Sequence, residues 1–167
     1  VVNQRNPTVK ITGTVAITSE LLQVDVSGCT FYGIEFLAGD NALTNLVDIA
    51  DAADVNGCWF HSCVFNGADK TSVAGIQMDD ATFIPTGVVV EQCLFRDLTG
   101  THVDVGALGM PYALFRNNYF ALDINSGTVF ALADTAAFAT GKGFEISNNV
   151  FLGFDGTDYE RAAEILV

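Results

Sequence analysis

Apolar and polar positions alternate over short stretches along most of the chain, and one six-residue pattern recurs. The stretch FRNNYF at 115–120 reads apolar, polar, polar, Asn, any residue, Phe, and ISNNVF at 146–151 repeats it. Three further segments place Cys where these two have Asn: VSGCTF at 26–31, FHSCVF at 60–65 and VEQCLF at 90–95. A pattern that recurs every 25–34 residues indicates a repeat architecture in which successive units stack.

Each of these hexads predicts a strand, a bend and a buried aromatic ring. Alternating apolar positions are typical of a strand with one buried face. The fourth position favours a bend, because asparagine tolerates left-handed backbone geometry and its amide can bond the neighbouring backbone. We therefore expect a ladder of small or bend-forming residues at one corner, with a column of phenylalanines packed behind it. The ladder residues are Cys29, Cys63, Cys93, Asn118 and Asn149, and the column is Phe31, Phe65, Phe95, Phe120 and Phe151.

A second alternating segment lies between most hexads, and Gly- and Asp-rich turns separate the two. These segments fall at 46–50, 73–79, 102–108, 128–134 and 162–167, and residues 8–26 would form the first coil. Two places leave alternatives open. The apolar spacing within 41–54 also fits a short helix, and 157–167 opens with a Thr-x-x-Glu capping box that suits a terminal helix as well as a strand.

These units resemble the rungs of right-handed parallel β-helices of the pectate-lyase-like superfamily, of the kind found in bacteriophage tailspike, fibre and virion proteins. The resemblance implies an all-β fold, a right-handed single-stranded parallel β-helix of about five to six rungs. The helix would cover residues 9–167, with 1–8 as an N-terminal arm or linker. The same fold serves polysaccharide lyases, polygalacturonases, epimerases and adhesins, so the resemblance predicts the fold and leaves the activity open.

Composition excludes some classes of partner. The chain has 20 acidic and 7 basic residues, a net charge of −13, so we expect neither nucleic-acid nor anionic-membrane binding. No apolar run approaches the roughly 18 residues of a membrane span. The four cysteines fit no zinc spacing, so we expect buried free thiols in the corner ladder, no metal and no cofactor.

Candidate chemistry is sparse. Of the motifs that polygalacturonases share, the chain contains only an Asp pair at 79–80, and no cationic residue stands beside an acidic cluster as in pectate lyases. Asp48, Asp79 and Asp104 fall at comparable places in successive second strands, so they are weak candidates for acid–base catalysis, for cation binding or for simple solvation. His102 and Asp104 should point to the same side of a strand as an exposed or hydrogen-bonded pair.

Trp59 alternates with Cys58 and Phe60, so it should point outward. An outward tryptophan is either covered by a loop or subunit, or serves as a platform for a sugar ring. We expect a non-catalytic structural virion component of the tailspike, fibre or capsid-decoration type. It would form a homotrimer in a virion or extracellular setting, in contact with other virion proteins and with a cell-surface glycan. The alternatives are an extracellular polysaccharide lyase or hydrolase and a carbohydrate-binding adhesin module.

Overall fold

The computed structural model confirms the all-β fold: parallel sheets wind into a β-solenoid. It describes residues 9–12, 19–50, 52–71, 73–78, 82–105, 110–122, 128–132, 143–153 and 165–166. Within these ranges no residue is helical, and so none of them belongs to a helix that could cross a membrane. The predicted arm at 1–8 lies outside the described residues, so the division into arm and domain stays a prediction.

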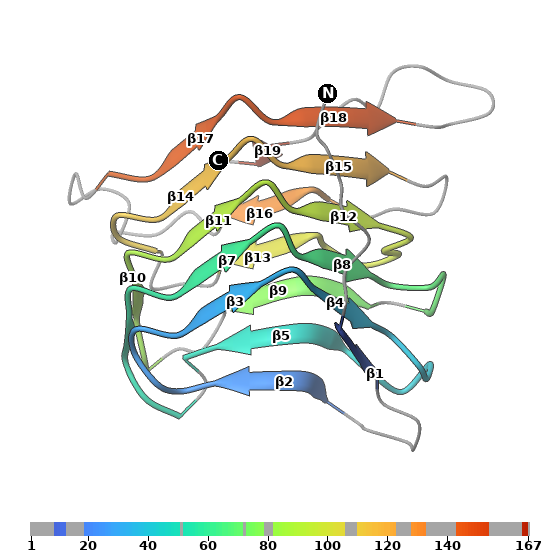
Figure 1. Cartoon of the computed structure of the whole chain (residues 1–167), viewed down its shortest axis with the longest axis horizontal. Helices are drawn as coiled ribbons and strands as arrows, with labels where there is room; N and C mark the ends of the chain where they lie inside the picture. Colours follow the sequence, from blue (N-terminus) through green and yellow to red (C-terminus); the bar gives the residue numbers. More distant parts are fainter. Residues whose placement is uncertain are drawn as a thin grey trace.

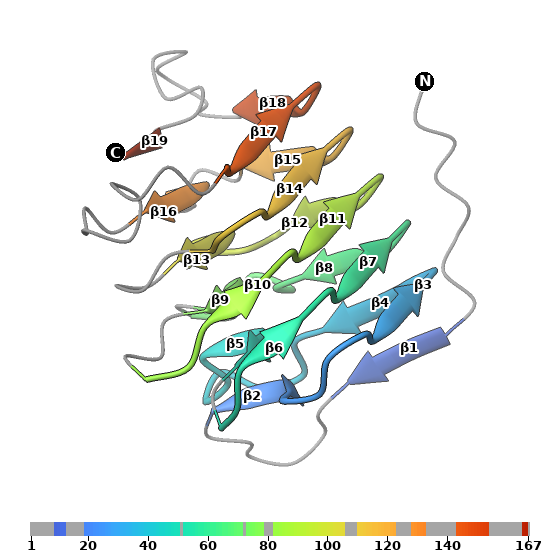
Figure 2. The ribbon, with the colours of Figure 1, turned by 90° about the vertical axis from the view of Figure 1, so that its left-hand side faces the viewer.

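Three long sheets form the walls of the solenoid, and every strand pair in them is parallel (Figures 1 and 2). The first sheet contains β3 (Thr30–Tyr32), β7 (Trp59–His61), β11 (Val89–Glu91), β14 (Leu114–Arg116) and β17 (Glu145–Ser147). The second contains β1 (Val9–Thr12), β4 (Ile34–Leu37), β8 (Val64–Asn66), β12 (Leu94–Arg96), β15 (Tyr119–Leu122) and β18 (Val150–Gly153). The third contains β2 (Glu20–Val24), β5 (Asn45–Ile49), β9 (Ala74–Met78), β13 (Val103–Val105), β16 (Phe130–Leu132) and β19 (Ile165–Leu166). A short pair, β6 (Val55–Asn56) and β10 (Pro85–Thr86), precedes two strands of the first sheet.

Each turn of the solenoid visits the three sheets in the same order. In Figure 1 the chain runs along β7 and β8 on the near side and returns along β9 on the far side, one level higher each time, which makes the coil right-handed. From β3 to β17 it completes about four turns. The sheets of five and six strands agree with the predicted number of rungs.

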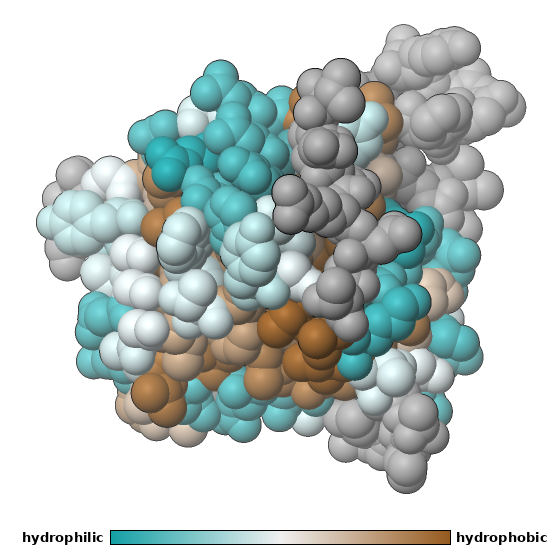
Figure 3. Space-filling model, viewed as in Figure 1, coloured by the Kyte–Doolittle hydropathy of each residue, from teal (hydrophilic) through white to brown (hydrophobic). Residues whose placement is uncertain are grey.

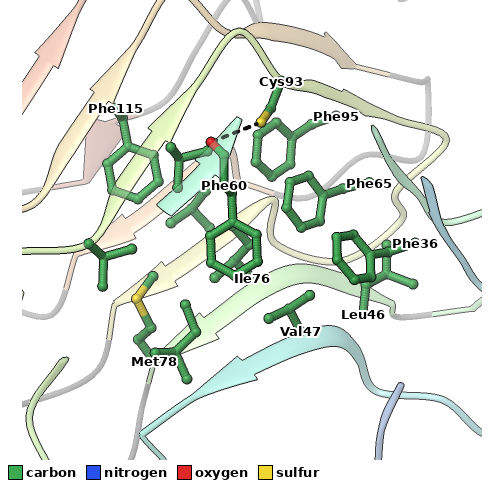
Figure 4. Packing of buried hydrophobic residues seen from close by; sticks show 14 of the residues in the cluster. Phe36, Leu46, Val47, Phe60, Phe65, Ile76, Met78, Cys93, Phe95 and Phe115 are labelled. Carbon is green, nitrogen blue, oxygen red and sulfur yellow. Dashed lines mark hydrogen bonds between the residues drawn. The ribbon is translucent and has the colours of Figure 1, made fainter. Parts of the chain in front are cut away.

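The phenylalanine column exists, with one correction at its first member. Stacked ring pairs join Phe65 to Phe95 at 4.5 Å between centroids, Phe95 to Phe120 at 4.7 Å and Phe120 to Phe151 at 5.2 Å. The ring below Phe65 is Phe36, at 5.3 Å, as Figure 4 shows. Each fully buried ring stabilises the fold by roughly 1.5–3 kcal/mol, so this column dominates the core.

The predicted register of Phe31 and Cys29 was wrong. Phe31 pairs with Phe60 and stacks on it at 4.7 Å, in a second column beside the first. The first rung therefore aligns through FYGIEF at 31–36, which puts Ile34 at the fourth position. Ile34, an apolar residue, occupies the end of the ladder, so a pattern that requires Cys or Asn at the fourth position matches the earlier segment 26–31 instead.

The bend also lies one residue earlier than expected. Residues at the third hexad position have positive φ in every rung: Gly33 at 66°, Ser62 at 55°, Gln92 at 54°, Asn117 at 57° and Asn148 at 53°. The left-handed conformation turns the chain from the first sheet into the second and aims the fourth side chain into the interior. Asn118 and Asn149 are therefore ladder residues, and their neighbours make the corner.

Hydrogen bonds explain why Cys and Asn share the fourth position. The Asn118 amide donates to the Val90 carbonyl at 2.9 Å, and the Asn149 amide donates to the Phe115 carbonyl at 2.9 Å. The Cys93 thiol donates to the Phe60 carbonyl at 3.5 Å (Figure 4), and the Cys63 thiol donates to the Phe31 carbonyl at 3.4 Å. In each case the acceptor is the backbone carbonyl of the first hexad residue on the rung below. A cysteine thiol and an asparagine amide therefore donate the same hydrogen bond.

The second strands match their predicted places, and the helix alternative at 41–54 was wrong for the described residues. Residues 45–49 form β5, in which every side chain is buried. The apolar spacing that fitted a helix arises because β5 packs on both faces. At the chain end, Ile165–Leu166 pairs with β16 as a strand, and the rest of 157–167 lies outside the described residues.

Candidate functional site

The outer face of the first sheet carries two columns of side chains in register. They point outward because they alternate with inward residues such as Phe31, Phe60 and Phe115. One column is Tyr32, His61, Glu91, Arg116 and Ser147, and the other is Thr30, Trp59, Val89, Leu114 and Glu145. Because all of these positions come from a rigid, hydrogen-bonded sheet, their spacing is fixed by the rungs at about 4.8 Å.

Aromatic side chains occupy the lower part of this face. Trp59 is 40% exposed and Tyr32 is 66% exposed, which confirms that Trp59 points outward. The Tyr32 ring stacks on the His61 ring at 5.0 Å with an interplanar angle of 9°, and the Trp59 ring meets the edge of the same imidazole at 5.3 Å. Exposed rings held in this way can receive the apolar face of a ligand without first being ordered.

A buried carboxylate anchors the polar part of the face. Glu91 is only 7% exposed, and Arg116 Nε donates to its Oε2 at 2.7 Å. His61 Nε2 lies 3.7 Å from Glu91 Oε1, and His61 Nδ1 lies 3.0 Å from the Ser62 hydroxyl. The Arg116 guanidinium compensates the buried charge of Glu91. This network fixes the orientation of the imidazole between the two aromatic rings.

A second charged cluster lies on the outer face of the second sheet. The buried Glu35 carboxylate contacts Lys10 Nζ at 2.9 Å and Arg96 at 3.2 Å, and it accepts a hydrogen bond from Asn66 at 3.0 Å. Burial alone would raise the pKa of the Glu35 carboxyl, but hydrogen bonds from these three side chains outweigh it and hold the pKa below its ordinary value. The ionised Glu35 carboxylate therefore links side chains from neighbouring rungs through ion pairs and hydrogen bonds.

Of the three aspartates proposed as weak catalytic candidates, the two that the structure describes lie two rungs apart. Asp48 and Asp104 share one column of the third sheet, with Gln77 on the rung between them. Two rung spacings separate their backbones by roughly 9.5 Å, at the upper limit for a glycosidase carboxylate pair. Asn45 donates to the Asp48 carboxylate at 3.1 Å. Asp79 lies outside the described residues, and a catalytic role for these aspartates stays a prediction.

No group of three or more His, Cys, Asp or Glu within the described ranges is arranged to hold a metal ion. The sequence analysis missed Tyr32, Glu91 and Arg116. Each stands at the second hexad position, the same place as His61, so an alignment of the hexads in the correct register would have placed them in one column.

The prediction that His102 is exposed or hydrogen-bonded to Asp104 was wrong. His102 is fully buried, with its ring 6.4 Å from Phe95 and 6.1 Å from Phe120 between centroids. Neither ring nitrogen has a hydrogen-bond partner among the described residues. His102 precedes β13, so the alternation that turns Asp104 outward does not govern it. Burial lowers the pKa of His102 to about 4, and the nearby backbone groups of Ala121 and Thr128, which do not meet hydrogen-bond geometry, offset this only in part.

The buried imidazole should make the fold sensitive to acid. The unfolded chain binds a proton on this histidine near pH 6.5, whereas the folded chain binds it near pH 4, so the free energy of unfolding falls as the pH drops through this window. The full contribution is about 3 kcal/mol. Urea unfolding of wild type and His102→Leu between pH 7 and pH 4 measures it: the wild type should lose more stability than the variant by most of that amount. Val150→Ala, an exposed change at a residue that does not titrate, should follow the wild type, and parallel curves for wild type and His102→Leu would contradict the assignment.

Fold and surface together define a class: a right-handed parallel β-solenoid with one aromatic and polar outer face. Comparison of the chain with protein-family models, with curated proteins and with solved structures gives no match.

Proposed function

We propose that the chain is a non-catalytic structural component of a virion, of the tailspike, fibre or capsid-decoration type within the pectate-lyase-like superfamily. In this role it forms a homotrimer, attaches to other virion proteins, and presents the outer face of the first sheet to a cell-surface glycan. The resemblance of the hexads to tailspike rungs supports the class, and the geometry of the face supports the glycan contact.

The glycan contact is supported by one observation: the outer face of the first sheet combines exposed aromatic rings with hydrogen-bonded polar side chains. Trp59 and Tyr32 offer exposed aromatic rings, and the imidazole of His61 contacts both of them. The carboxylate of Glu91 is engaged by Arg116, so this group suits binding and orientation better than proton transfer. Aromatic rings beside ordered hydrogen-bonding groups suit a sugar, which has an apolar face and a rim of hydroxyls.

The ends of the solenoid support assembly. Among the described strands, β1, β2 and β3 each stand at the end of their sheet and pair on one side only. Hydrophobic residues gather low on the face drawn in Figure 3, around β3 and β4, where Phe31 and Ile34 are only half-buried. Open edges beside apolar side chains favour self-association or coverage by a partner. A side-by-side trimer with flanking domains would cover both, as closed symmetric assemblies do.

Light scattering and a glycan panel test this function on one preparation. The mass in solution should be about three times the chain mass of 17.7 kDa. The trimer should bind at least one surface polysaccharide saturably without releasing products. Trp59→Ala should weaken that binding by roughly tenfold or more, or about 1.4 kcal/mol, while Val150→Ala, an exposed apolar change on another sheet, should leave it unchanged.

Other outcomes favour the alternatives. Release of reducing ends or unsaturated sugars would overturn the proposal in favour of an extracellular polysaccharide hydrolase or lyase. A stable monomer that binds glycan would overturn the virion trimer in favour of a carbohydrate-binding adhesin module. A trimer whose glycan binding does not respond to Trp59→Ala would contradict the assignment of this face.

A further inference from the structure

Two cysteines lie on neighbouring rungs at the end of the first sheet that β3 forms. Cys29 and Cys58 are in register on neighbouring rungs, since Trp59 N donates to the Cys29 carbonyl at 2.8 Å and Thr30 pairs with Trp59. Both thiols donate to one acceptor, the Val26 carbonyl, at 3.2 Å from Cys29 Sγ and 3.6 Å from Cys58 Sγ. Because both thiols contact the same carbonyl oxygen, the two sulfur atoms lie close to one another.

The backbone geometry suits a disulfide. Neighbouring strands lie about 4.8 Å apart, and disulfides link residues whose Cα atoms are about 4.4–6.8 Å apart. Cys29 precedes β3, and β3 is the end strand of its sheet among the described residues, which place a neighbouring rung on one side of Cys29. It is half-buried rather than buried. Cys29 can therefore shift toward Cys58, and a small oxidant can reach it.

A second cysteine pair in the same molecule provides a comparison. Cys63 and Cys93 are also in register, with Leu94 N donating to the Cys63 carbonyl at 2.9 Å. Cys63 is 1% exposed and Cys93 is 0% exposed, and each of them has a neighbouring rung on both sides. Their thiols donate to two different carbonyls. Burial raises the pKa of Cys93 well above its ordinary value and also raises the pKa of Cys58, so the two pairs differ in the other partner: Cys63 is buried, whereas Cys29 is half-buried.

We propose that Cys29 and Cys58 form a disulfide in an oxidising environment and that this bond clamps the first rung of the solenoid to the second. The oxidant is a small-molecule disulfide such as oxidised glutathione. The Cys29 thiolate attacks one glutathione sulfur and expels a glutathione thiolate. The Cys58 thiolate then attacks Cys29 Sγ and expels the second. Two protein thiols are oxidised, one glutathione disulfide is reduced to two thiols, and these take up the two protons.

The link would enclose one turn of the coil, from residue 29 to residue 58. Such a link stabilises a fold mainly by restricting the unfolded chain, and the effect grows with the length of the closed loop. It would act where the sheets end, at β3, so it would also limit fraying of the first rung. This inference is independent of the proposed function, because it depends only on the two thiols and their access.

Incubation of the purified chain with oxidised glutathione, followed by thiol titration and peptide mapping, tests the proposal. Two of the four thiols should disappear, and a peptide pair linked through Cys29 and Cys58 should form. The midpoint of thermal unfolding should rise by roughly 5 °C or more and return on reduction. Cys29→Ser, at a half-buried site where folding should be preserved, should abolish both the linked peptide and the rise.

Three results would overturn the proposal. Cys29 could remain as a mixed disulfide with glutathione, it could link to Cys29 of a second copy, or the Cys63–Cys93 pair could be oxidised first. Each produces a distinct peptide mass, so the readout does not depend on the stability of any variant.

Discussion

Replacing Phe120 by alanine should lower the free energy of unfolding by about 3–5 kcal/mol. The Phe120 ring stacks between Phe95 and Phe151 and meets the edge of Phe130 at 5.2 Å. Its removal leaves a cavity within a column that is bounded above and below by other rungs, and the hydrogen-bonded strands on all sides limit how far the walls can collapse. The midpoint of thermal unfolding should fall by roughly 10 °C or more.

The matched control lies on the same strand. Tyr119 is adjacent in β15 but points to the outer face, so Tyr119→Ala should cost about 1 kcal/mol or less. Urea unfolding of both variants, followed by circular dichroism, gives the comparison. A cost for Phe120→Ala no larger than that for Tyr119→Ala would mean that the ring is not in the core.

Replacing Asn118 by alanine should lower the free energy of unfolding by about 2–4 kcal/mol, because two buried backbone groups lose their partners. The Asn118 side-chain oxygen accepts the Cys93 N–H at 2.9 Å, and its amide donates to the Val90 carbonyl at 2.9 Å. Asn118 is 1% exposed, so water cannot easily replace these bonds. Equilibrium unfolding in urea measures the loss.

Two further variants separate the ladder bond from the bend. Asn118→Cys should cost less than Asn118→Ala, since a thiol at this position can donate to the Val90 carbonyl, as the thiols of Cys93 and Cys63 donate to the corresponding carbonyls on lower rungs. Asn117→Gly should be nearly neutral, because Asn117 is exposed and only its positive φ matters. If Asn117→Gly were as costly as Asn118→Ala, the roles of the two asparagines would have to be exchanged.

Much of the fold could be predicted from the sequence because the repeating unit has a strict period within the strands. The alternation on both sides of the bend placed four of the five hexads and the second strands correctly, and it turned Trp59 outward. Loop lengths do not disturb this signal, since insertions lie outside the hydrogen-bonded rungs. The right register of four of the five phenylalanines followed from the same pattern.

The position of the bend and the register of the first rung were predicted wrongly because the local sequence pattern there fits two different backbone arrangements. Two adjacent asparagines, such as Asn117 and Asn118, are both able to adopt left-handed geometry, so sequence alone does not show which one turns the chain. At the first rung Ile34 replaces the polar ladder residue, because no hexad lies below it in the described part of the chain to supply the carbonyl that a ladder side chain bonds. The hexad pattern was therefore matched to Cys29 at the fourth position, and Phe31 was assigned to the sixth position in place of Phe36.

The candidate site was only partly predictable for a related reason. Tyr32 could not be grouped with His61 while the first rung was misaligned, and the pairing of Glu91 with Arg116 joins residues 25 positions apart in the chain. His102 turned inward at a corner, where the strand alternation no longer applies. Contacts between rungs depend on register, and a single misplaced unit changes every neighbour in its column.

Ring-to-ring nuclear Overhauser contacts in a phenylalanine-labelled sample test the stacked register most directly. The right-handed coil predicts contacts of Phe95 with Phe65 and with Phe120, of Phe120 with Phe151, and of Phe36 with Phe65, while Phe31 should stack on Phe60. Absence of the contact between Phe95 and Phe120, or a direct stack of Phe31 on Phe65, would contradict the winding from which the site and both proposals follow.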